Sequence, residues 1–463
     1  RNILSCEVHT NISKRVLFAT DASAYKQLPT AIIFPENKKD IQVIVKFANE
    51  NKINLIPRGG GTSLAGQVVG DGIVIDVSKY MTNILEINKE AKWVSVEPGV
   101  VLTELNRELE NQNLFFGPET SSANRVTIGG MVGNNASGLH LLVYGDTRSK
   151  LISVNAILSD GSEVVFEELS KVEFEKKRQQ NDLEGDIYRK FAEILSSEEN
   201  RNLILENSPS PNVIKRNTGY ALENVAQTEI FGDFNRKFNL AKLIAGSEGT
   251  LAFITEIKLH LDTLPPKNKA LVCVHFDNLK DTFKANLIAL KYKPAAVELM
   301  DKKILDLTID NIEQNKNRFF INGDPEALIF VEFADEEKKI IEQKAKEMEA
   351  EMRSLGYGYH FAVVWGTDIK KVWNLRKAGL GVLSNLAGDA KPVSLVEDTA
   401  VDVEVLPDYI ADFELIIQKH KLSCVYHAHI GSGELHLRPI LNLKKSEDVE
   451  LFRKIAYLSL IHI

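Results

Sequence analysis

The chain has 463 residues, of which 44% are hydrophobic and 26% charged, and its formal net charge is −8. This length exceeds one ordinary hydrophobic core and favours two domains, while the composition is that of a soluble globular protein. The acidic balance argues against a general nucleic-acid binder, and no apolar run is long enough to span a membrane.

After a polar lead-in over residues 1–27, short apolar runs alternate with amphipathic stretches as far as residue 264. Strands are predicted at 31–34, 53–56, 72–77, 93–96, 152–158, 163–166 and 252–261. Helices are predicted over 102–109 and from Asp40, which we take as an N-cap. The polar stretch 181–211 is expected to be an excursion over the surface. This mixture of strands and helices indicates an α+β domain.

Residues 264–269 read Leu-Pro-Pro-Lys-Asn-Lys and are predicted to form a linker, because proline disfavours a helix before it and cannot donate to a sheet. Beyond the linker, strands are predicted at 270–276, 296–300, 328–333 and 360–364, with helices at 279–290 and 335–355. Such strand–helix–strand units favour an antiparallel sheet backed by helices. The two predicted domains are therefore 28–264 and 265–463.

The three cysteines, Cys6, Cys273 and Cys424, are widely spaced and form no Cys-x-x-Cys pair. The chain therefore cannot build a zinc ribbon or an iron–sulfur cluster from its own thiolates alone. We expect Cys273 and Cys424 to be buried thiols in a reducing, cytoplasmic compartment, with the protein either free or peripheral to the inner membrane. The residues leave open whether the protein is a monomer or a homodimer.

The most informative motif is Pro-Arg-Gly-Gly-Gly-Thr-Ser-Leu-Ala-Gly-Gln at 57–67, which follows a predicted strand. Adjacent glycines let the backbone turn sharply and approach a ligand, and their amides can form an anion site that the hydroxyls of Thr62 and Ser63 extend. Leu64 and Gln67 stand where a dinucleotide fingerprint needs glycine and a P-loop needs lysine. On its own, the motif is equally consistent with a pyrophosphate site and a flexible linker.

Four further segments, at 117–122, 127–138, 144–147 and 245–251, are rich in glycine and small polar residues. Any one of them alone is typical of a turn. Five such segments in order within one predicted domain are better explained by a shared ligand than by five unrelated turns.

With these motifs, residues 28–264 resemble the FAD-binding domain of the vanillyl-alcohol oxidase (PCMH-type) superfamily, and above all its D-lactate, glycolate and D-2-hydroxyglutarate dehydrogenases. The lead-in 19–25 is similar to long members that carry a C-terminal iron–sulfur domain. The resemblance implies an α+β fold in which two subdomains enclose a non-covalently bound FAD and an α+β cap domain follows. The residues that it implies for FAD are Arg58, Gly59, Gly60, Gly61, Thr62, Ser63, Leu64, Gln67, Pro118, Glu119, Thr120, Gly129, Gly130, Asn134, Asn135, Ser137, Gly138, Glu248, Gly249, Thr250 and Ile254.

A second informative region, residues 426–438, contains three histidines. If Ser432-Gly433 is a two-residue hairpin turn, His429 pairs with His436 and their Cβ atoms lie ~5 Å apart. Two imidazoles at that separation can share one metal ion. His427 falls on the same face, opposite Arg438, and is the weaker candidate. The alternative is that these are strand histidines bonded to the backbone.

The same resemblance extends to this region. Metal-dependent members carry a Gly-His-x-Gly-Asp-Gly-Asn-Leu-His segment whose histidines bind a divalent ion such as zinc or manganese, and His429 and His436 match them. Ala428, Ser432 and Glu434 replace the Gly, Asp and Asn of that segment. The family's third ligand and catalytic base come from a later Glu-His-Gly segment, which we expect, together with an iron–sulfur module, beyond residue 463.

Arg376 and Lys391 match, in type and spacing, residues that hold the substrate carboxylate in D-2-hydroxyacid dehydrogenases. Arginine suits this role because its planar fork can bond both carboxylate oxygens. Leu380 stands where the family often supplies a hydroxyl, so a polar contact is lost. Glu397 and Asp398 are expected either to orient the two cations or to be structural. The alternative for Arg376 is a surface ion pair.

The sequence therefore predicts an FAD-dependent dehydrogenase that oxidises a D-2-hydroxy acid to the 2-keto acid, with Arg376, Lys391 and His436 as catalytic residues and His429 and His436 as metal ligands. Electrons are expected to pass to an iron–sulfur centre, an electron carrier or a quinone. Two alternatives remain at this stage. One is an oxidase or synthase of the same superfamily with another substrate, and the other is a non-catalytic binding subunit built on the FAD fold.

Overall fold

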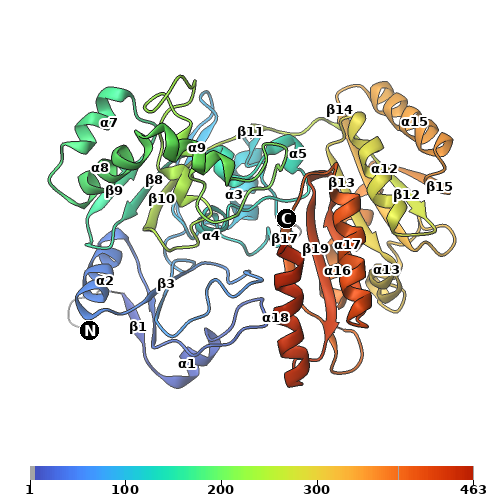
Figure 1. Cartoon of the computed structure of the whole chain (residues 1–463), viewed down its shortest axis with the longest axis horizontal. Helices are drawn as coiled ribbons and strands as arrows, with labels where there is room; N and C mark the ends of the chain where they lie inside the picture. The colour runs from blue at the N-terminus through green and yellow to red at the C-terminus, as the bar shows by residue number, and fades with distance from the viewer. Residues whose placement is uncertain (1–5, 384, 462–463) are drawn as a thin grey trace. The chain divides into compact units, whose positions relative to one another are not determined.

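The computed structural model describes residues 6–383 and 385–461, which form two compact units (Figure 1). Unit 1 comprises Arg1–Gly138, Tyr144–Pro209 and Arg216–Leu264, and unit 2 comprises Leu139–Val143, Ser210–Lys215 and Pro265–Ile463. Both units mix helices with sheets, so the predicted α+β class is confirmed. Among the described residues, no helix has the length and apolar character that crossing a membrane requires.

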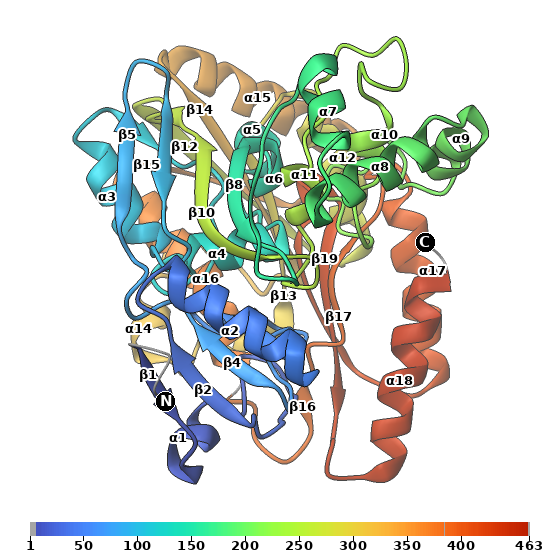
Figure 2. The ribbon, with the colours of Figure 1, turned by 90° about the vertical axis from the view of Figure 1, so that its left-hand side faces the viewer.

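The first sheet of unit 1 has the strand order β1-β2-β4-β3, in which β2 and β3 run parallel to β4. Its strands are β1 (Glu7–His9), β2 (Ala31–Phe34), β3 (Leu55–Arg58) and β4 (Ile73–Asp76). Helix α2 (Lys38–Asn51) lies across this sheet (Figure 2) and buries Ile41 and Ile44 in its core. The glycine-rich motif begins at the carboxyl end of β3.

The N-cap of α2 is Asn37, whose side chain accepts hydrogen bonds from the backbone N–H groups of Lys39 and Asp40. The cap predicted at Asp40 is therefore wrong by three residues. Asp40 lies in the first turn instead, and its carboxylate accepts from the backbone N–H of Glu36. A carboxylate at that position reaches back over the helix start and complements the helix dipole, so its acidic character still favours this end of the helix.

The second sheet of unit 1 is antiparallel and has the order β5-β6-β10-β8-β9. Its strands are β5 (Ile84–Asn88), β6 (Trp93–Val96), β8 (Leu151–Ile157), β9 (Glu163–Phe166) and β10 (Phe253–His260). Strand β10 lies between β6 and β8 in this sheet. The glycine-rich segment 245–251 directly precedes β10 and therefore belongs to the same unit as the other glycine-rich segments. The remaining short elements of unit 1 are α1 (Ile12–Leu17), α3 (Leu102–Glu110), β7 (Leu114–Phe115), α4 (Ile128–Asn134), α6 (Thr147–Lys150), α10 (Glu223–Ala226), α11 (Ala241–Ile244) and β11 (Asp262–Thr263). Helix α5 (Leu141–Tyr144) begins in the Leu139–Val143 segment of unit 2.

The stretch predicted as a surface excursion, 181–211, forms α8 (Leu183–Leu195) and α9 (Glu198–Glu206), after α7 (Lys171–Arg178). Tyr188 on α8 is fully buried and packs against Phe174 and Phe238. The prediction agrees with α9, which has no buried residue, but it is wrong for α8, where a few buried residues lie among many polar ones. The buried positions of α8 recur at helical spacing, and one such stripe is enough to attach a helix to the core.

Unit 2 is built on one antiparallel sheet of eight strands, in the order β15-β12-β14-β13-β18-β19-β16, with β17 also paired to β19. The strands are β12 (Asn268–Phe276), β13 (Ala296–Asp301), β14 (Ala327–Asp335), β15 (His360–Trp365), β16 (Lys391–Pro392), β17 (Val396–Ala400), β18 (Cys424–His429) and β19 (Glu434–Leu441). Alternate residues of β12 enter two different cores, so this sheet is buried on both faces.

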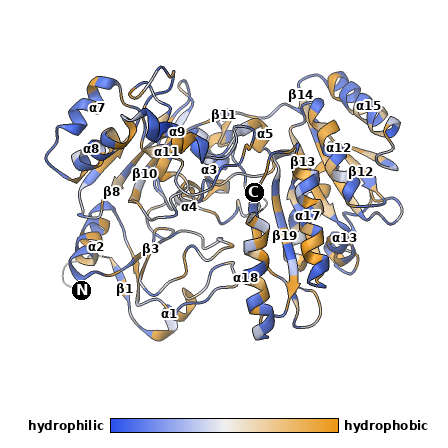
Figure 3. Cartoon of the chain, in the orientation of Figure 1, coloured by the Kyte–Doolittle hydropathy of each residue, from blue (hydrophilic) through white to orange (hydrophobic). Residues whose placement is uncertain are grey.

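Helices cover both faces of that sheet. They are α12 (Lys280–Lys291), α13 (Lys302–Leu307), α14 (Ile312–Asn315), α15 (Lys338–Ser354), α16 (Asp368–Leu383), α17 (Leu406–Lys419) and α18 (Ser446–Ile461). The charged helix α15 shows both colours in Figure 3, and its buried residues Ile341, Ala345, Met348 and Met352 share a core with β12. Cys273 and Cys424 are buried and form no disulfide, as predicted.

Glu332 is a carboxylate on β14 that is 1% exposed within unit 2. It accepts hydrogen bonds from His140 (3.0 Å) and from the indole of Trp373 (2.8 Å), and Lys269 lies 3.4 Å away. Burial by itself raises the pKa of Glu332, but His140, Lys269 and Trp373 outweigh it and lower the pKa from 4.5 to about 2.

We expect Glu332 to make unit 2 acid-sensitive. Because its folded-state pKa lies below the unfolded value, its stabilising contribution is complete above about pH 4.5 and is lost as the pH falls towards about 2. The free energy of unfolding, measured by denaturant titration at several pH values across this window, should therefore fall more steeply in the wild type than in Glu332→Gln. Parallel pH profiles for the two proteins would contradict the assignment.

Candidate functional site

The glycine-rich loop packs closely against the start of α4. A Cβ atom on Gly59 would lie 2.1 Å from Oγ1 of Thr127, and one on Gly60 would lie 2.3 Å from the carbonyl oxygen of Arg125. Gly61 has φ +63°, in the left-handed region that favours glycine. Close packing thus requires glycine at positions 59 and 60, and the backbone conformation favours it at 61, which distinguishes this loop from a flexible linker.

The Arg58 side chain contacts the lead-in of unit 1. Its Nη2 donates to the carbonyl oxygen of Thr20 at 2.9 Å, and its guanidinium lies 5.1 Å from the ring centre of Phe18. Desolvation by burial lowers its pKa, partly offset by Asp76 and Asp21. In this arrangement the side chain anchors the lead-in, so the FAD contact predicted for Arg58 would fall to its backbone.

The five glycine-rich segments contact one another within unit 1. Gln67 donates to Glu248 at 3.1 Å, and the backbone N–H of Glu248 donates to the carbonyl oxygen of Gly133 at 2.9 Å. A Cβ on Gly138 would lie 1.3 Å from the carbonyl oxygen of Glu119, so those two segments are in direct backbone contact. The fold therefore gathers residues that are up to 181 positions apart in the sequence.

The 144–147 and 245–251 segments are tied in by side chains. Asp146 accepts a hydrogen bond from the amide of Asn135 at 2.7 Å, and the hydroxyls of Thr250 and Tyr220 lie 2.9 Å apart. The remaining predicted residue, Ile254, is half-buried near the start of β10.

Three residues of this region were missed from the sequence. Tyr220 contacts Thr250, and Asn217 accepts from Asn135 at 3.0 Å and donates to the carbonyl oxygen of Asn134. Arg148 is 5% exposed, and its Nη2 donates to the carbonyl oxygen of Ala245 at 2.7 Å. None of the three stands in a recognisable motif, although Arg148 directly follows the 144–147 segment.

The histidine hairpin of unit 2 consists of β18 and β19, with His427 opposite His436 and His429 opposite Glu434. The predicted two-residue turn is wrong, because Ile430–Ser432 forms a 3₁₀ turn that Gly433 closes with φ +73°. The register therefore shifts by two residues. Since side chains alternate along a strand, an even shift keeps the three histidines on one face.

The histidine rings lie close together on that face. The ring centres of His429 and His436 are 5.2 Å apart, and those of His427 and His436 are 5.5 Å apart. Burial lowers the pKa of His427, and the charge of Arg376 adds to this effect. Burial also disfavours protonation of His436, but Glu397 and Asp398 outweigh it and raise the pKa of His436 above its usual value.

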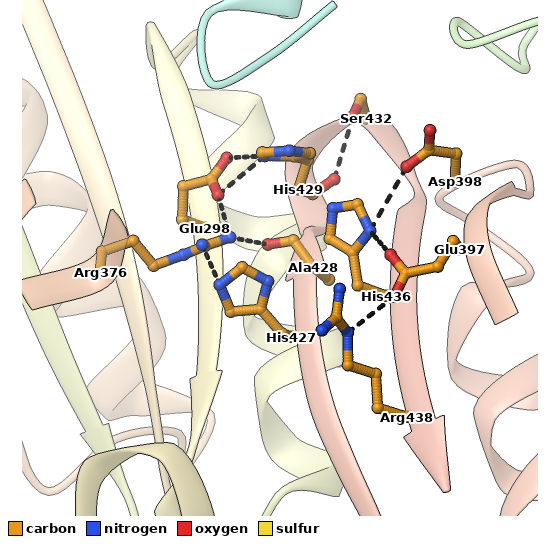
Figure 4. A network of polar contacts seen from close by, with 10 residues as sticks. All are labelled: Glu298, Arg376, Glu397, Asp398, His427, Ala428, His429, Ser432, His436 and Arg438. Atoms are coloured by element: carbon orange, nitrogen blue, oxygen red, sulfur yellow. Dashed lines mark hydrogen bonds and ion pairs between the residues drawn. The ribbon is translucent and has the colours of Figure 1, made fainter. Parts of the chain in front are cut away.

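Two carboxylates, the buried Glu298 and the half-buried Glu397, hold two of the histidines by their Nδ1 atoms (Figure 4). Glu298 lies 2.8 and 2.9 Å from Nδ1 of His429, and Glu397 lies 2.9 Å from Nδ1 of His436. Within the described residues, no hydrogen bond engages Nε2 of either ring. Metal-binding histidines are commonly oriented in this way, with the other ring nitrogen donating to a carboxylate. The donor set thus fits a divalent ion.

A bulge in β17 places two consecutive carboxylates beside His436. Between Val396 and Thr399, β17 advances three residues while β19 advances two, and Asp398 takes φ +54°. Both Glu397 and Asp398 can therefore face the same ring, with Asp398 3.4 Å from its Nδ1. Ligand atoms of these two residues and of His436 lie within 4.8 Å of one another, so these three side chains form a second candidate ligand set for a cation.

Arg376 lies on α16 and is 4% exposed, so the alternative of a surface ion pair is wrong. Its Nη2 pairs with Glu298 at 2.5 Å and donates to the carbonyl oxygen of Ala428 at 3.2 Å, and its Nη1 contacts His427 (Figure 4). The structure brings the arginine to the histidine face. Its predicted contact with a substrate carboxylate stays a prediction.

Lys391 is half-buried on β16, and its ammonium donates to the carbonyl oxygen of Leu386. The side chain of Leu380 lies outside the described part of the structure, so the loss of a polar contact there stays a prediction. Glu397 and Asp398 contact His436, and Glu397 also lies 2.7 Å from Nε of Arg438. Glu298 was missed. Its signal was a lone charge in the otherwise apolar run Ala296–Met300.

Comparison with known proteins matches both parts of the chain. The FAD binding domain family matches residues 29–167, and the C-terminal domain of FAD linked oxidases matches 265–459. D-2-hydroxyglutarate dehydrogenases of Escherichia coli K12 and Pseudomonas putida KT2440 are 34% and 32% identical, covering 96% and 97% of this chain but 44% and 45% of their own length. Glycolate oxidase subunit GlcD of Bacillus subtilis is 25% identical, over 94% of this chain and 78% of its own.

Solved structures agree on the fold. An alkyldihydroxyacetonephosphate synthase has a TM-score of 0.64 at 15% identity, covering 98% of this chain and 76% of its own. A p-cresol methylhydroxylase has a TM-score of 0.66 at 12% identity, covering 98% and 83%. The chain spans less than half the length of the curated D-2-hydroxyglutarate dehydrogenases named above. It carries an FAD binding domain followed by the C-terminal domain of FAD linked oxidases.

Proposed function

We propose that this chain is the flavin- and substrate-binding part of a dehydrogenase that oxidises a D-2-hydroxy acid to the 2-keto acid. The proposal rests on one face of unit 2, where the carboxylates of Glu298 and Glu397 orient His429 and His436 beside the buried guanidinium of Arg376. The D-2-hydroxyglutarate dehydrogenases that share 34% identity along almost the whole chain support the same substrate class.

The FAD is proposed to lie against the glycine-rich segments of unit 1. FAD supplies the hydride acceptor when it is bound. The backbone amides of residues 59–61 and the hydroxyls of Thr62 and Ser63 would meet its diphosphate without burying an unpaired cation. Gly59 and Gly60 support this fit. Thr127 and the backbone of Arg125 occupy the space that a Cβ atom at these positions would need, so a larger residue would displace the loop from its present path.

A divalent ion, zinc or manganese, is proposed on Nε2 of His429 and Nε2 of His436. Such an ion supplies Lewis acidity towards a substrate hydroxyl. Glu298 and Glu397 would keep both rings in the ligating tautomer by accepting their Nδ1–H groups. Arg376 and Lys391 would fix the substrate carboxylate by charge-assisted hydrogen bonds and so align its Cα–H bond.

The acceptor of the electrons is proposed to be an iron–sulfur centre, an electron carrier or a quinone. One relative of this chain, 26% identical, is named a cytochrome-linked D-lactate dehydrogenase of Saccharomyces cerevisiae, which favours an acceptor other than oxygen.

The FAD-loaded protein should reduce an artificial dye with D-2-hydroxyglutarate, D-lactate or glycolate. We expect His436→Ala and Lys391→Met each to lower kcat/KM roughly 100-fold, because the first removes a metal ligand and the second a carboxylate contact. Flavin absorbance should be unchanged in both. His260→Ala, at the exposed end of β10, is the matched control and should retain activity.

The outcomes separate the alternatives. Unchanged kcat/KM in both variants would reject the assigned roles. A yellow protein that binds no metal and oxidises none of the three acids would favour another substrate of the same oxidase family. A protein that stays colourless after addition of FAD would favour a non-catalytic subunit.

A further inference from the structure

Glu298 is the most constrained carboxylate on the histidine face of unit 2. It lies on β13 and is 1% exposed, in the middle of a sheet that is buried on both faces. Its carboxylate contacts two side chains (Figure 4). Oε1 and Oε2 lie 2.8 and 2.9 Å from Nδ1 of His429, and Oε2 also accepts from Nη2 of Arg376 at 2.5 Å. An isolated carboxylate in this position would be very costly, so both partners are needed to retain it.

The contact with His429 has a chemical consequence. An ionised carboxylate can only accept hydrogen bonds, so Nδ1 of His429 must be the donor. In the neutral ring, Nε2 then carries the lone pair, which is the state that a metal ligand requires. Arg376 also donates to the carbonyl oxygen of Ala428, the residue before His429, and so fixes the strand that bears the ring.

We propose that Glu298 is a positioning residue for the metal site: it sets the tautomer and orientation of His429, while Arg376 neutralises its charge in the core. This inference rests on the proposed function, because it takes His429 as a metal ligand. It adds a residue that acts through His429 and touches neither the metal nor the substrate.

The test compares zinc affinity in two variants that both lack the arginine. Glu298→Gln alone would leave Arg376 buried with a weaker partner and could unfold unit 2. We therefore compare Arg376→Met with the double variant Glu298→Gln/Arg376→Met, in which both charges are absent. Each FAD-loaded protein is freed of metal with a chelator and titrated with Zn²⁺ by calorimetry. The double variant should bind zinc roughly 10- to 100-fold more weakly than Arg376→Met.

Glu332→Gln is the matched control, because Glu332 is equally buried in the same sheet and also accepts a hydrogen bond from a histidine, His140. Its zinc affinity should equal that of the wild type. Equal zinc affinity in Arg376→Met and the double variant would overturn the role of Glu298 alone. A loss in Glu332→Gln as large as that in the double variant would also overturn it, by showing a general effect of core polarity. Failure of the wild type to bind zinc would overturn the metal site of the proposed function, and this inference with it.

Discussion

Replacing Gly138 with alanine is expected to give a protein that no longer holds FAD. The new Cβ would lie 1.3 Å from the carbonyl oxygen of Glu119 and 3.4 Å from the amide nitrogen of Thr120. Both contacts are with backbone, so no side-chain rotation relieves them, and the two predicted flavin-lining segments must separate. Purified Gly138→Ala should therefore lack the visible absorbance of bound flavin.

Gly133→Ala provides the control for this prediction. Gly133 belongs to the same glycine-rich segment and lies within α4, but the nearest atom to its added Cβ, the Cα of Glu248, is 3.9 Å away. Alanine in a helix is favoured over glycine by about 0.5–1 kcal/mol. This variant should stay yellow and should unfold at slightly higher denaturant concentration. If Gly138→Ala retained full flavin content, the contact between 119 and 138 would have no part in the FAD site.

Replacing Arg376 with methionine is expected to lower the free energy of unfolding of unit 2 by about 3 kcal/mol. The substitution leaves Glu298 buried with His429 as its remaining partner, and it removes the donor to the carbonyl oxygen of Ala428. Denaturant unfolding followed by tryptophan fluorescence would measure the loss, because Trp365 and Trp373 both lie in unit 2.

Two further variants serve as a control and a rescue for this result. Arg353→Met removes an exposed arginine that pairs with Glu349 on α15, and it should change stability by less than about 0.5 kcal/mol. Adding Glu298→Met to Arg376→Met should restore much of the lost stability, since two apolar side chains replace a buried ion pair. Equal stability of Arg376→Met and the wild type would show that the pair is not energetically coupled to the fold.

Local patterns in the sequence were sufficient for the fold class and for many of the strands, although β1, β5 and β17 were not predicted. The predicted strand at 93–96 agrees with β6, and that at 270–276 lies within β12, because buried strands are apolar runs bounded by polar residues. The same reasoning missed α8, where few apolar residues form a single stripe. Such patterns report which residues are buried, but a stretch that is mostly polar can conceal a helix.

The details of the candidate site depended on features that local patterns do not carry. The hairpin register moved by two residues because Gly433 closes a 3₁₀ turn, and only the even size of that shift preserved the shared histidine face. Glu298 and His429 are 131 residues apart, and the bulge that turns Glu397 and Asp398 to His436 arises from strand pairing. Long-range contacts of this kind follow from tertiary packing, so a single sequence could suggest the histidines but not their carboxylate partners.

The chain passes repeatedly between its two units, which limits how the protein can be divided into fragments. Residues 139–143 and 210–215 belong to unit 2, although the stretches on either side of each belong to unit 1, so the polypeptide passes between the units five times. A fragment made of residues 265–463 alone would lack His140, which holds the buried Glu332. Each unit is therefore built from three separate stretches of the chain, and neither can be exchanged between proteins or produced separately as one uninterrupted piece.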